Sequence, residues 1–465
     1  MSNQGKSIDQ SLINIGGVFP QLAVVAGHIP RTETGIGALM PWADHLWFIT
    51  YPASGATSGV GHGLFMIDGD MRMTRHPASV VGTYANRIIH SASHQLIIGP
   101  HLIDTQGGVR TIESLKPYRL AATALHLEDP DNKVYFLTME ALLFEANVHT
   151  LETRLLFDLR QDLGLQQVRH LHFKDACTAH GRLVVANNTY TETDALGKPS
   201  QGRLAEWDGR EWRIIETCQF NAVTASSSEI GTALLAMGTD NASAILRVFA
   251  GGKWDKYRLP KATHTQDHSW TTEWPRIREI ESERWLMDCA GMFYELPAMQ
   301  YGGKVWGIRP ISTHLRIIAD FCSWRGLLVL AGNQTTPIND SNPFVGQPQA
   351  GLWFGKSDDL WRFGKPQGWG GPWWEDAVKA NQPSDPFLFT GFEHKVLHLH
   401  HDADCTVNFT IEVDFLGNGA WCVYDEVKVG SRGYGYHVFP TGFSAHWARV
   451  ISDATCTVSA QFTYT

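Results

Sequence analysis

The stretch HLWFITY (45–51) decides the fold, because this short, strongly apolar strand signal recurs along the chain and ends each time in small or polar residues. The start-to-start spacings are 50, 38, 49, 51, 51 and 43 residues, which is the period of a four-stranded β-propeller blade. Strands that are apolar on both faces are buried on both faces, so each copy is expected to be the innermost strand of its blade. The further copies are QLIIGP (95–100), KVYFLTME (133–140), RLVVANNT (182–189), ALLAMGTD (233–240), RWLMDCAG (284–291) and LLVLAGNQ (327–334).

A second element follows most of these strands and reads as a β-hairpin. It consists of an alternating strand, a polar turn with Asp-Gly, Gly-Gly or Asp-Asp at its centre, and another strand, which is the pattern of a tight antiparallel connection. The alternation puts one face of the hairpin into the core between blades. The copies cover residues 63–76, 142–158, 202–216, 244–260 and 351–366.

Together these elements predict an all-β protein, a seven-bladed β-propeller with an additional C-terminal β segment. The propeller is expected over residues 1–384, with residues 1–35 as an N-terminal extension and residues 365–384, rich in Gly, Pro and Trp, as a long loop. Residues 385–465 contain further alternating strands. Alternation alone leaves open whether these strands form a small β-sandwich or are added to the disc.

Composition restricts the partners and the compartment. The formal net charge is −9 and no run of Lys or Arg occurs, so we expect no nucleic-acid partner, because binding phosphates needs a concentrated basic surface. The chain contains no stretch of about 18 apolar residues, so we expect no membrane span. The seven cysteines lack a CxxC pair and read as free thiols. The chain begins without a leader pattern, which predicts a cytoplasmic protein, or a secreted one whose leader was removed.

Segments expected to cross one face of the disc are rich in chemically capable residues, and loops on a rigid scaffold often carry sites. Within one of them, His170, His172, Cys177 and His180 are zinc-ligand types, but their spacing matches no common structural zinc pattern. We therefore assign no metal ligands, and a bound Ca or Zn ion is compatible with the sequence without being required. The four crossing segments are residues 82–94, 168–180, 264–280 and 312–322.

Several catalytic signatures are absent. The chain has no GxSxG, no P-loop, no HEXXH and no Rossmann glycine pattern between a strand and a helix. Serine-hydrolase, nucleotide-dependent and zinc-protease functions therefore lose support.

Longer motifs carry a family resemblance that extends over roughly residues 35–465. The chain resembles the seven-bladed propellers that act as L-rhamnose-α-1,4-D-glucuronate lyases on arabinogalactan and gum arabic. These enzymes were formerly classed as glycoside hydrolases and are related to ulvan lyases. The motifs are GTYANRIIH (82–90), HQLIIGPHLID (94–104), KVYFLTME (133–140), HFKDACTAHGRLVVANNTY (172–190), RLAEWDGREW (203–212), LPKATHTQDHSWTTEWPRIREI (259–280), GMFYELP (291–297) and SDPFLFTGF (384–392).

The resemblance implies cleavage of a rhamnose–glucuronate linkage by β-elimination, with a uronate-containing oligo- or polysaccharide as partner. A base must take the C5 proton, and His90 or His172 is expected in this role because imidazole titrates near neutral pH. A cation must neutralise the uronate carboxylate, a role suited to the guanidinium fork. The candidates for that role are Arg87, Lys174, Arg276 and Arg278. Sugar contacts are expected from Asn86, His268, Trp270 and Glu273, and His62 could reach the rim of the channel.

Other interpretations remain open. Arg276 and Arg278 could form a structural bridge to Glu273 or Glu279. Cys177 and His180 stand where the family pattern has Tyr and Gln, and PASGATSG precedes His62 where a His often comes sooner. A non-catalytic glycan- or protein-binding propeller is therefore an alternative. A hydrolase using the same pocket is another, although hydrolysis calls for paired carboxylates and the crossing segments offer mainly Glu273 and Asp320.

Overall fold

The structure is a computed structural model, and it describes residues 33–52, 63–168, 171–189, 202–225, 234–262, 274–281, 284–297, 307–314, 317–335 and 350–465. Nearly all of the regular structure in these residues is β-strand, which confirms the all-β prediction. The helical elements described are three short turns, none of them long enough to cross a bilayer. They are η1 (Glu113–Leu115), α1 (Leu159–Asp162) and η2 (Ser357–Arg362).

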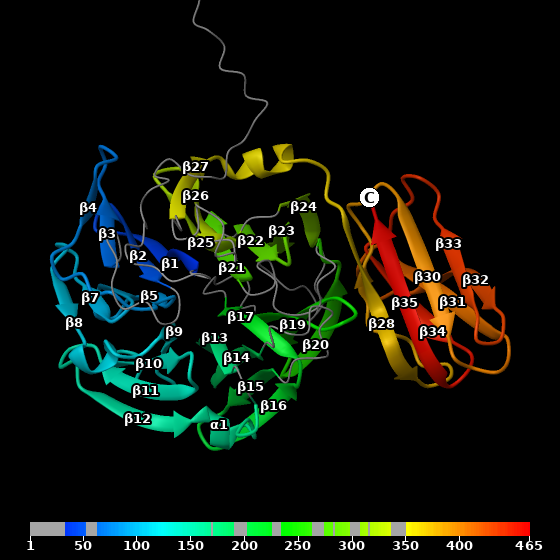
Figure 1. The fold of residues 1–465 in the computed structure, drawn as a ribbon, viewed down its shortest axis with the longest axis horizontal. Coiled ribbons are helices and arrows are strands. Elements are labelled where there is room, and N and C mark those ends of the chain that lie inside the picture. Colours follow the sequence, from blue (N-terminus) through cyan, green and yellow to red (C-terminus); the bar gives the residue numbers. More distant parts are fainter. Residues whose placement is uncertain are drawn as a thin grey trace, which may run out of the picture.

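The strands up to Gly355 form a β-propeller, in which consecutive strands pair antiparallel and the groups are arranged around a centre (Figure 1). The groups in the first half of the propeller have four strands each. They are β1 (Glu33–Trp42), β2 (His45–Pro52), β3 (Gly63–Ile67) and β4 (Met73–Arg75); β5 (Arg87–His90), β6 (Gln95–Ile98), β7 (His101–Ile103) and β8 (Val109–Thr111); β9 (Leu120–Leu125), β10 (Lys133–Thr138), β11 (Leu142–Asn147) and β12 (Thr153–Asp158).

The remaining groups continue the same pattern around the disc, and the last one joins the first. Glu33 and Thr34 of β1 pair with Thr335 and Gln334 of β26, so the sheet that begins the propeller also ends it. The strands are β13 (Leu171–Ala179), β14 (Arg182–Thr189), β15 (Arg203–Trp207) and β16 (Trp212–Glu216); β17 (Gln219–Ala225), β18 (Leu234–Thr239), β19 (Ala244–Ala250) and β20 (Lys253–Leu259); β21 (Arg276–Glu281), β22 (Arg284–Cys289), β23 (Met292–Pro297) and β24 (Arg309–Thr313); β25 (Ile317–Trp324), β26 (Leu327–Thr335) and β27 (Ala350–Gly355).

The recurring apolar strand is the second strand of each group, not the innermost one. HLWFITY lies in β2, and the other copies lie in β6, β10, β14, β18, β22 and β26. The first strands lie nearest the centre (Figure 1) and pack against one another. A second strand is covered by neighbouring groups on both faces and is therefore apolar throughout. A first strand borders the centre and can carry charge. The expectation of innermost apolar strands was wrong for this reason.

Hairpin turns are built as their sequences predict in most copies. In the β3–β4 turn, the Asp68 carboxylate accepts hydrogen bonds from the backbone N–H groups of Asp70 and Arg72, both at 2.9 Å. In the β15–β16 turn, Asp208 accepts from Arg210 and Glu211 at 2.8 and 3.0 Å. The hydrogen bonds of such Asx turns form between residues close in the chain, so these turns can be predicted from the sequence. The copy at 351–366 is different, because β27 is followed by the 3₁₀ helix η2 and not by a returning strand.

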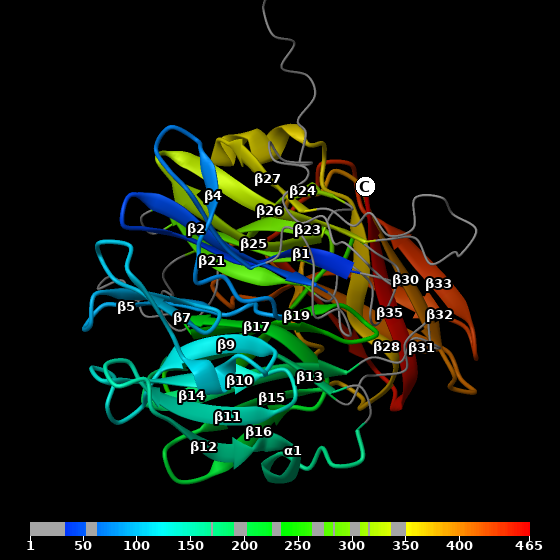
Figure 2. The same ribbon diagram turned by 60° about the vertical axis from the view of Figure 1, so that its left-hand side comes forward.

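The C-terminal strands form two sheets. One has the order β28-β35-β30-β33, and the other contains β29-β34-β31-β32 and continues from β20 of the propeller (Figures 1 and 2). The loop expected over 365–384 was wrong for Gly368–Val378, which is strand β28 paired with β35. The strands are β28 (Gly368–Val378), β29 (Phe387–Leu388), β30 (Lys395–His401), β31 (Val407–Asp414), β32 (Cys422–Val429), β33 (Tyr434–Val438), β34 (Trp447–Ser452) and β35 (Cys456–Tyr464).

One continuous hydrophobic core joins these two sheets to the propeller. Buried side chains of β30 and β35, such as Leu397 and Phe462, pack in the same cluster as Phe409 of β31 and Leu246 of β19. The connection is also made through the backbone, because Arg258 of β20 pairs in parallel with Phe387 of β29. The sheet that contains β29-β34-β31-β32 therefore extends the propeller sheet that contains β20.

Candidate functional site

The first strands place charged side chains at the centre of the propeller because several of them carry a β-bulge at a corresponding position. A bulge inserts one extra residue and re-aims the side chains beside it. Gly37 is the most constrained of these extra residues, since a Cβ there would lie 1.9 Å from the Tyr84 carbonyl oxygen. The extra residues are Gly37 in β1, Ala121 in β9, Lys174 in β13, Asn221 in β17 and Ala319 in β25.

Asp320, directly after the bulge of β25, forms ion pairs with two arginines from other groups. Arg87 of β5 donates from Nε to Oδ2 at 2.6 Å and from Nη2 to Oδ1 at 3.2 Å. Arg278 of β21 donates from Nε to Oδ1 at 2.9 Å. Charge-assisted contacts of this kind are stronger than neutral hydrogen bonds, so one carboxylate joins three separate strands.

Asp320 also accepts a hydrogen bond from the backbone N–H of Leu39 in β1 at 2.9 Å. Its side chain is only 1% exposed. Burial alone would raise the pKa of Asp320, but the Arg87 and Arg278 guanidiniums lower that pKa to about 2. The carboxylate is therefore ionised at neutral pH and ties β1, β5, β21 and β25 together.

Asp175 occupies the corresponding position after the bulge of β13. It accepts hydrogen bonds from the backbone N–H groups of Ala176 at 2.9 Å and Val223 at 3.0 Å. Val223 lies on the next first strand, β17, just as Leu39 lies on the strand next to Asp320. Burial raises the pKa of Asp175, while the charges of Arg278 and Arg276 act in the opposite direction. Asp175 and Asp320 are thus equivalent links between neighbouring groups.

Lys174 and Arg276 place two further cations beside the indole of Trp274. The Lys174 ammonium lies 5.3 Å from the ring centroid and the Arg276 guanidinium 5.4 Å from it, within the range of cation–π contacts. The Tyr51 ring stacks on Trp274 with centroids 5.4 Å apart. All of these side chains except Tyr51 come from, or directly precede, the strands β13 and β21. They form a buried cationic and aromatic cluster.

Arg276 is the most unusual member of this cluster. It is 3% exposed, and its guanidinium donates to the Pro275 carbonyl at 2.8 Å. Burial lowers the pKa of Arg276, and the charge of Arg278 lowers it further. Among the described residues, no carboxylate lies within ion-pair distance of Arg276. The charges of Asp175 and Asp320 act in the opposite direction, so in the described part of the chain the buried charge of Arg276 is balanced from a distance and not by a direct ion pair.

One member of a buried carboxylate–histidine pair lies opposite Arg276 in the sheet. Asp288 of β22 is opposite Arg276 in the sheet register, and it contacts Nε2 of His314 at 3.0 Å. Burial raises the pKa of Asp288, and the His314 and Arg276 charges counteract this rise. The pair is almost fully buried, so it links β22 to the residue that follows β24 and offers no exposed acid.

The first strands therefore bring together four cationic side chains, Arg87, Lys174, Arg276 and Arg278, and the two carboxylates that follow bulges, Asp175 and Asp320. The carboxylates are already bound by arginines or backbone N–H groups. Within the described first strands, cations therefore gather next to an aromatic ring. Such an arrangement can bind an anion, and guanidinium groups favour carboxylates in particular.

The predicted base His90 is not placed at this cluster. Its ring is fully buried, with Nδ1 hydrogen bonded to Ser93 Oγ at 2.7 Å and Nε2 to the Pro130 carbonyl at 2.8 Å. Both ring nitrogens are therefore used to fasten the β5–β6 turn to the segment before β10. The surroundings of His90 are those of a structural histidine.

His172 and Asn86 occupy different places in the fold. His172 lies on β13, two residues before Lys174, and is opposite Asn188 in the register. Asn86 is 1% exposed and donates to the Gly99 carbonyl at 2.9 Å and to Thr123 Oγ1 at 2.8 Å, which links β5 to β9. His172 thus shares strand β13 with Lys174, and Asn86 has a structural contact.

Four predicted site residues, His62, His268, Trp270 and Glu273, lie outside the described residues, and so does His170 of the zinc-like segment. In the rest of that segment, Cys177 is half-buried, and desolvation raises the pKa of its thiol to about 12. His180 is exposed in the β13–β14 turn. Across the described part of the chain, no three His, Cys, Asp or Glu side chains are grouped to hold a metal ion. Arg278 pairs with Asp320, and not with Glu279, in the described contacts.

Sequence reasoning missed Asp175, Tyr51 and Trp274. A carboxylate inside an otherwise apolar strand is rarely buried without a specific partner, and IIADFCSW, the strand of Asp320, has this feature. The strand of Asp175, LHFKDACTA, lacks it because it also contains His, Lys and Thr. Trp274 and Tyr51 had no comparable signal, since tryptophan and tyrosine are ordinary core residues of a propeller. Their proximity depends on pairing across the ring.

Comparison with known proteins found no matching family model and no matching curated protein. Similar solved structures include the RRP9 WD40 repeats, with 9% identity, a TM-score of 0.40 and coverage of 71% of this chain and 96% of that one. The β-propeller domain of Cps50 (Swd1) of Myceliophteria thermophila has 12% identity, a TM-score of 0.41 and coverage of 71% and 98%. The WD40 β-propeller domain of Doa1 has 10%, 0.40, 74% and 98%. At such TM-scores these likenesses carry no argument about function.

Proposed function

We propose that the chain is a seven-bladed propeller with a C-terminal β-sandwich, and that its centre acts on a uronate-containing glycan as a lyase. The blade count is supported by the strand groups that begin with β1, β5, β9, β13, β17, β21 and β25. The division into two units, with the boundary near Gly368 at the start of β28, is supported by the pairing of β28 with β35.

The functional proposal rests on the positions of Lys174 and Arg276 beside the Trp274 ring, where two cations can bind an anion. Both are buried cations that contact the Trp274 ring, at 5.3 and 5.4 Å. A uronate offers a carboxylate to the cations and an apolar ring face to an aromatic side chain. Binding of the carboxylate would compensate the buried charge of Arg276.

In the proposed reaction, Arg276 and Lys174 hold the uronate carboxylate and stabilise the negative charge that develops when the C5 proton leaves. His172 takes this proton as the base. The electron pair of the C5–H bond forms the C4–C5 double bond, and the C4–O4 bond breaks. The leaving oxygen takes up the proton held by His172, which returns the imidazole to its neutral form, and it is released with the rhamnose residue. The elimination consumes no water.

Incubation of the full chain with gum arabic tests the proposal. We expect free rhamnose and an unsaturated uronate that absorbs near the ultraviolet edge, with products whose summed mass equals that of the substrate. Arg276→Gln should abolish release, and Arg309→Gln, an exposed arginine on β24 of the same group, should not. Products heavier by one water would indicate a hydrolase. Glycan binding without any product would indicate a binding propeller, and either result would overturn the lyase.

A further inference from the structure

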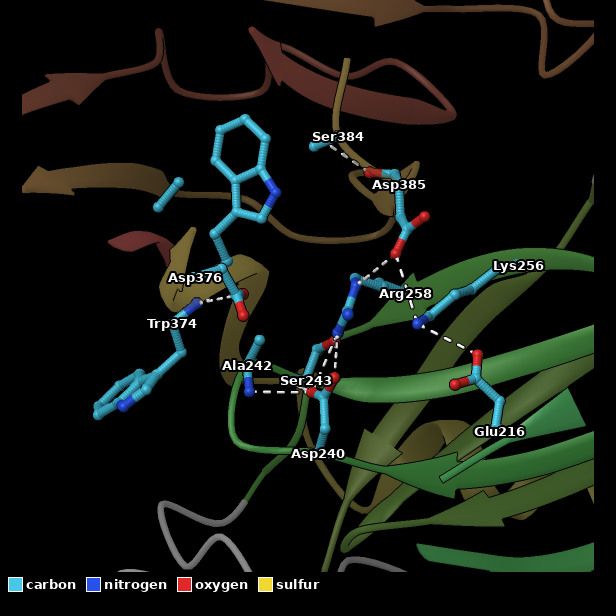
Figure 3. Close-up of polar contacts among 12 residues, drawn as sticks. Glu216, Asp240, Ala242, Ser243, Lys256, Arg258, Trp374, Asp376, Ser384 and Asp385 are labelled. Carbon is cyan, nitrogen blue, oxygen red and sulfur yellow. Dashed lines mark hydrogen bonds and ion pairs between the residues drawn. The ribbon is translucent and has the colours of Figure 1, made fainter. Parts of the chain in front are cut away.

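A second pocket lies where the propeller meets the C-terminal sheets, away from the centre. It has a volume of about 340 Å³ and lies between Arg258 of β20, the strand β28 and the segment that leads to β29 (Figure 3). This size is at the lower end of small-molecule sites. The walls include Trp373, Asp376, Lys379, Gln382 and Asp385.

The floor of the pocket is fixed by ion pairs of Arg258. Its Nη1 contacts Asp240 Oδ2 at 2.8 Å, and its Nε donates to Asp385 Oδ2 at 2.9 Å (Figure 3). Nη1 also donates to Ser243 Oγ at 2.9 Å. The Arg258 side chain is 7% exposed. Because these acceptors engage the guanidinium, it positions the carboxylate of Asp385 and is not itself a receptor for an anion.

Asp376, on β28, lines another wall of the pocket. Its Oδ2 accepts a hydrogen bond from the backbone N–H of Trp374 at 3.0 Å (Figure 3). Burial raises the pKa of Asp376, and the Arg258 charge partly offsets this rise. An ionised carboxylate accepts hydrogen bonds at both oxygens and donates none. Asp376 is exposed at the mouth of the pocket, so its carboxylate can accept a hydrogen bond from a bound molecule.

The charges of the lining balance. Arg258 and Lys379 supply two cations, and Asp376 and Asp385 supply two carboxylates. A ligand with a net charge would disturb this balance, whereas a neutral molecule rich in hydroxyl groups would not. Hydroxyl groups can donate to Asp376 and can both donate to and accept from the Gln382 amide. The indole of Trp373 adds an apolar wall.

We propose that the pocket between β20 and β28 binds one neutral sugar residue, recognised by Asp376, Gln382 and Trp373. This site is separate from the central cluster and does not rest on the proposed lyase chemistry. The two proposals are therefore distinguishable, because binding here is read without turnover. If both hold, the junction pocket anchors a neutral part of the glycan whose uronate enters the centre.

Ligand-observed NMR and calorimetry on the full chain test the inference, with the methyl glycosides of glucose, galactose, arabinose and rhamnose as neutral probes. Methyl glucuronoside and ethanolamine serve as an acidic and a basic probe. We expect at least one neutral probe to bind with a Kd of about 1 mM or higher. Asp376→Asn keeps the shape of the side chain and should weaken this binding about tenfold. Gln382→Ala should weaken it as well.

Glu375→Gln is the matched control, because Glu375 is the exposed neighbour of Asp376 and does not line the pocket. It should bind the neutral probe as the wild type does, and so should Arg276→Gln, since Arg276 belongs to the centre. Three results would each overturn the inference. They are no binding of any neutral probe, binding of ethanolamine or methyl glucuronoside alone, and unchanged binding in both Asp376→Asn and Gln382→Ala when these variants have the wild-type circular dichroism spectrum.

Discussion

Arg87 and Asp320 are 233 positions apart in the chain, yet the guanidinium contacts both carboxylate oxygens, at 2.6 and 3.2 Å. Arg87 begins β5, and Asp320 lies in β25, across β1 from it. The contact therefore links the sheet that closes the propeller to the sheet that follows its first group. Together with Arg278, Asp320 holds strands from different parts of the sequence in one arrangement around the centre.

Asp320→Asn is expected to destabilise the fold by about 3–5 kcal/mol, because it leaves two buried arginines without their carboxylate. Urea unfolding followed by tryptophan fluorescence measures this change. The control is Asp70→Asn, which removes the exposed contact of Asp70 with Arg72 at 3.2 Å. Exposed pairs of this kind contribute about 0–1 kcal/mol. Equal effects of the two substitutions would show that Asp320 does not hold the ring together.

The stability contributed by Asp320 should disappear in acid. The folded pKa of Asp320 is about 2, below the value of about 3.9 for an unfolded aspartate. A carboxyl with a depressed folded pKa stabilises the fold above its unfolded pKa and loses that effect as pH falls through the folded value. The difference in unfolding free energy between wild type and Asp320→Asn should thus be constant above pH ~5 and shrink by about 2–3 kcal/mol toward pH ~2. A difference that is flat over this interval would contradict the assignment.

Arg276→Gln should separate function from stability. Because burial of the Arg276 charge is offset only in part, by the charges of Asp175 and Asp320, its removal should leave the free energy of unfolding unchanged or increase it. If the charge serves the substrate, kcat/KM on gum arabic should fall by about 10²–10³. Parallel unfolding and rhamnose-release assays check both parts. A variant that unfolds more easily and retains turnover would reverse the interpretation.

The two candidate bases should respond differently to truncation. His90→Ala removes hydrogen bonds to Ser93 and Pro130 and should cost about 1–3 kcal/mol of stability, with turnover preserved below the unfolding temperature. His172→Ala should preserve the fold and abolish rhamnose release. Thermal unfolding and product release measured for both variants decide between them. Full turnover by His172→Ala would exclude it as the base.

Thiol accessibility provides a test of the packing. Cys405 and Cys422 are exposed, whereas Cys289 and Cys322 are buried among apolar side chains. Burial raises the pKa of Cys177 and of Cys218 to about 12 and that of Cys289 and Cys322 even further. Thiolates, not thiols, react with disulfide reagents. Ellman's reagent should therefore modify Cys405 and Cys422 first in the native protein, and mass spectrometry of the labelled peptides identifies them. Early labelling of Cys289 or Cys322 would contradict the packing.

The repeated second strands made the all-β propeller fold predictable from sequence. Strands such as β10, KVYFLT, are apolar on both faces because neighbouring groups cover them, and this property survives as a readable pattern. Hairpin turns with Asp68 and Asp208 were predictable because their hydrogen bonds are local. Strand β28 was not, because its Gly, Pro and Trp residues resemble a loop until β35 is present to pair with them.

The central cluster was only partly predictable, since its members meet through the closure of the ring. Arg87, Lys174, Arg276 and Arg278 were identified as cations, but their partners were not. Which carboxylate Arg278 binds depends on the position of β25 relative to β21, about 40 residues further on, and no local spacing encodes it. The same holds for Tyr51, which reaches Trp274 only after the first and later groups become neighbours.

The two-residue strand β29 has a consequence for biosynthesis. It hydrogen bonds to β20 on one side and to β34 on the other, and β34 ends at Ser452, close to the end of the chain. Until β34 has been translated, the edge of β29 that faces away from β20 has no partner. An unpaired edge invites pairing with another nascent chain, so aggregation during synthesis should be most sensitive to truncations that remove β34.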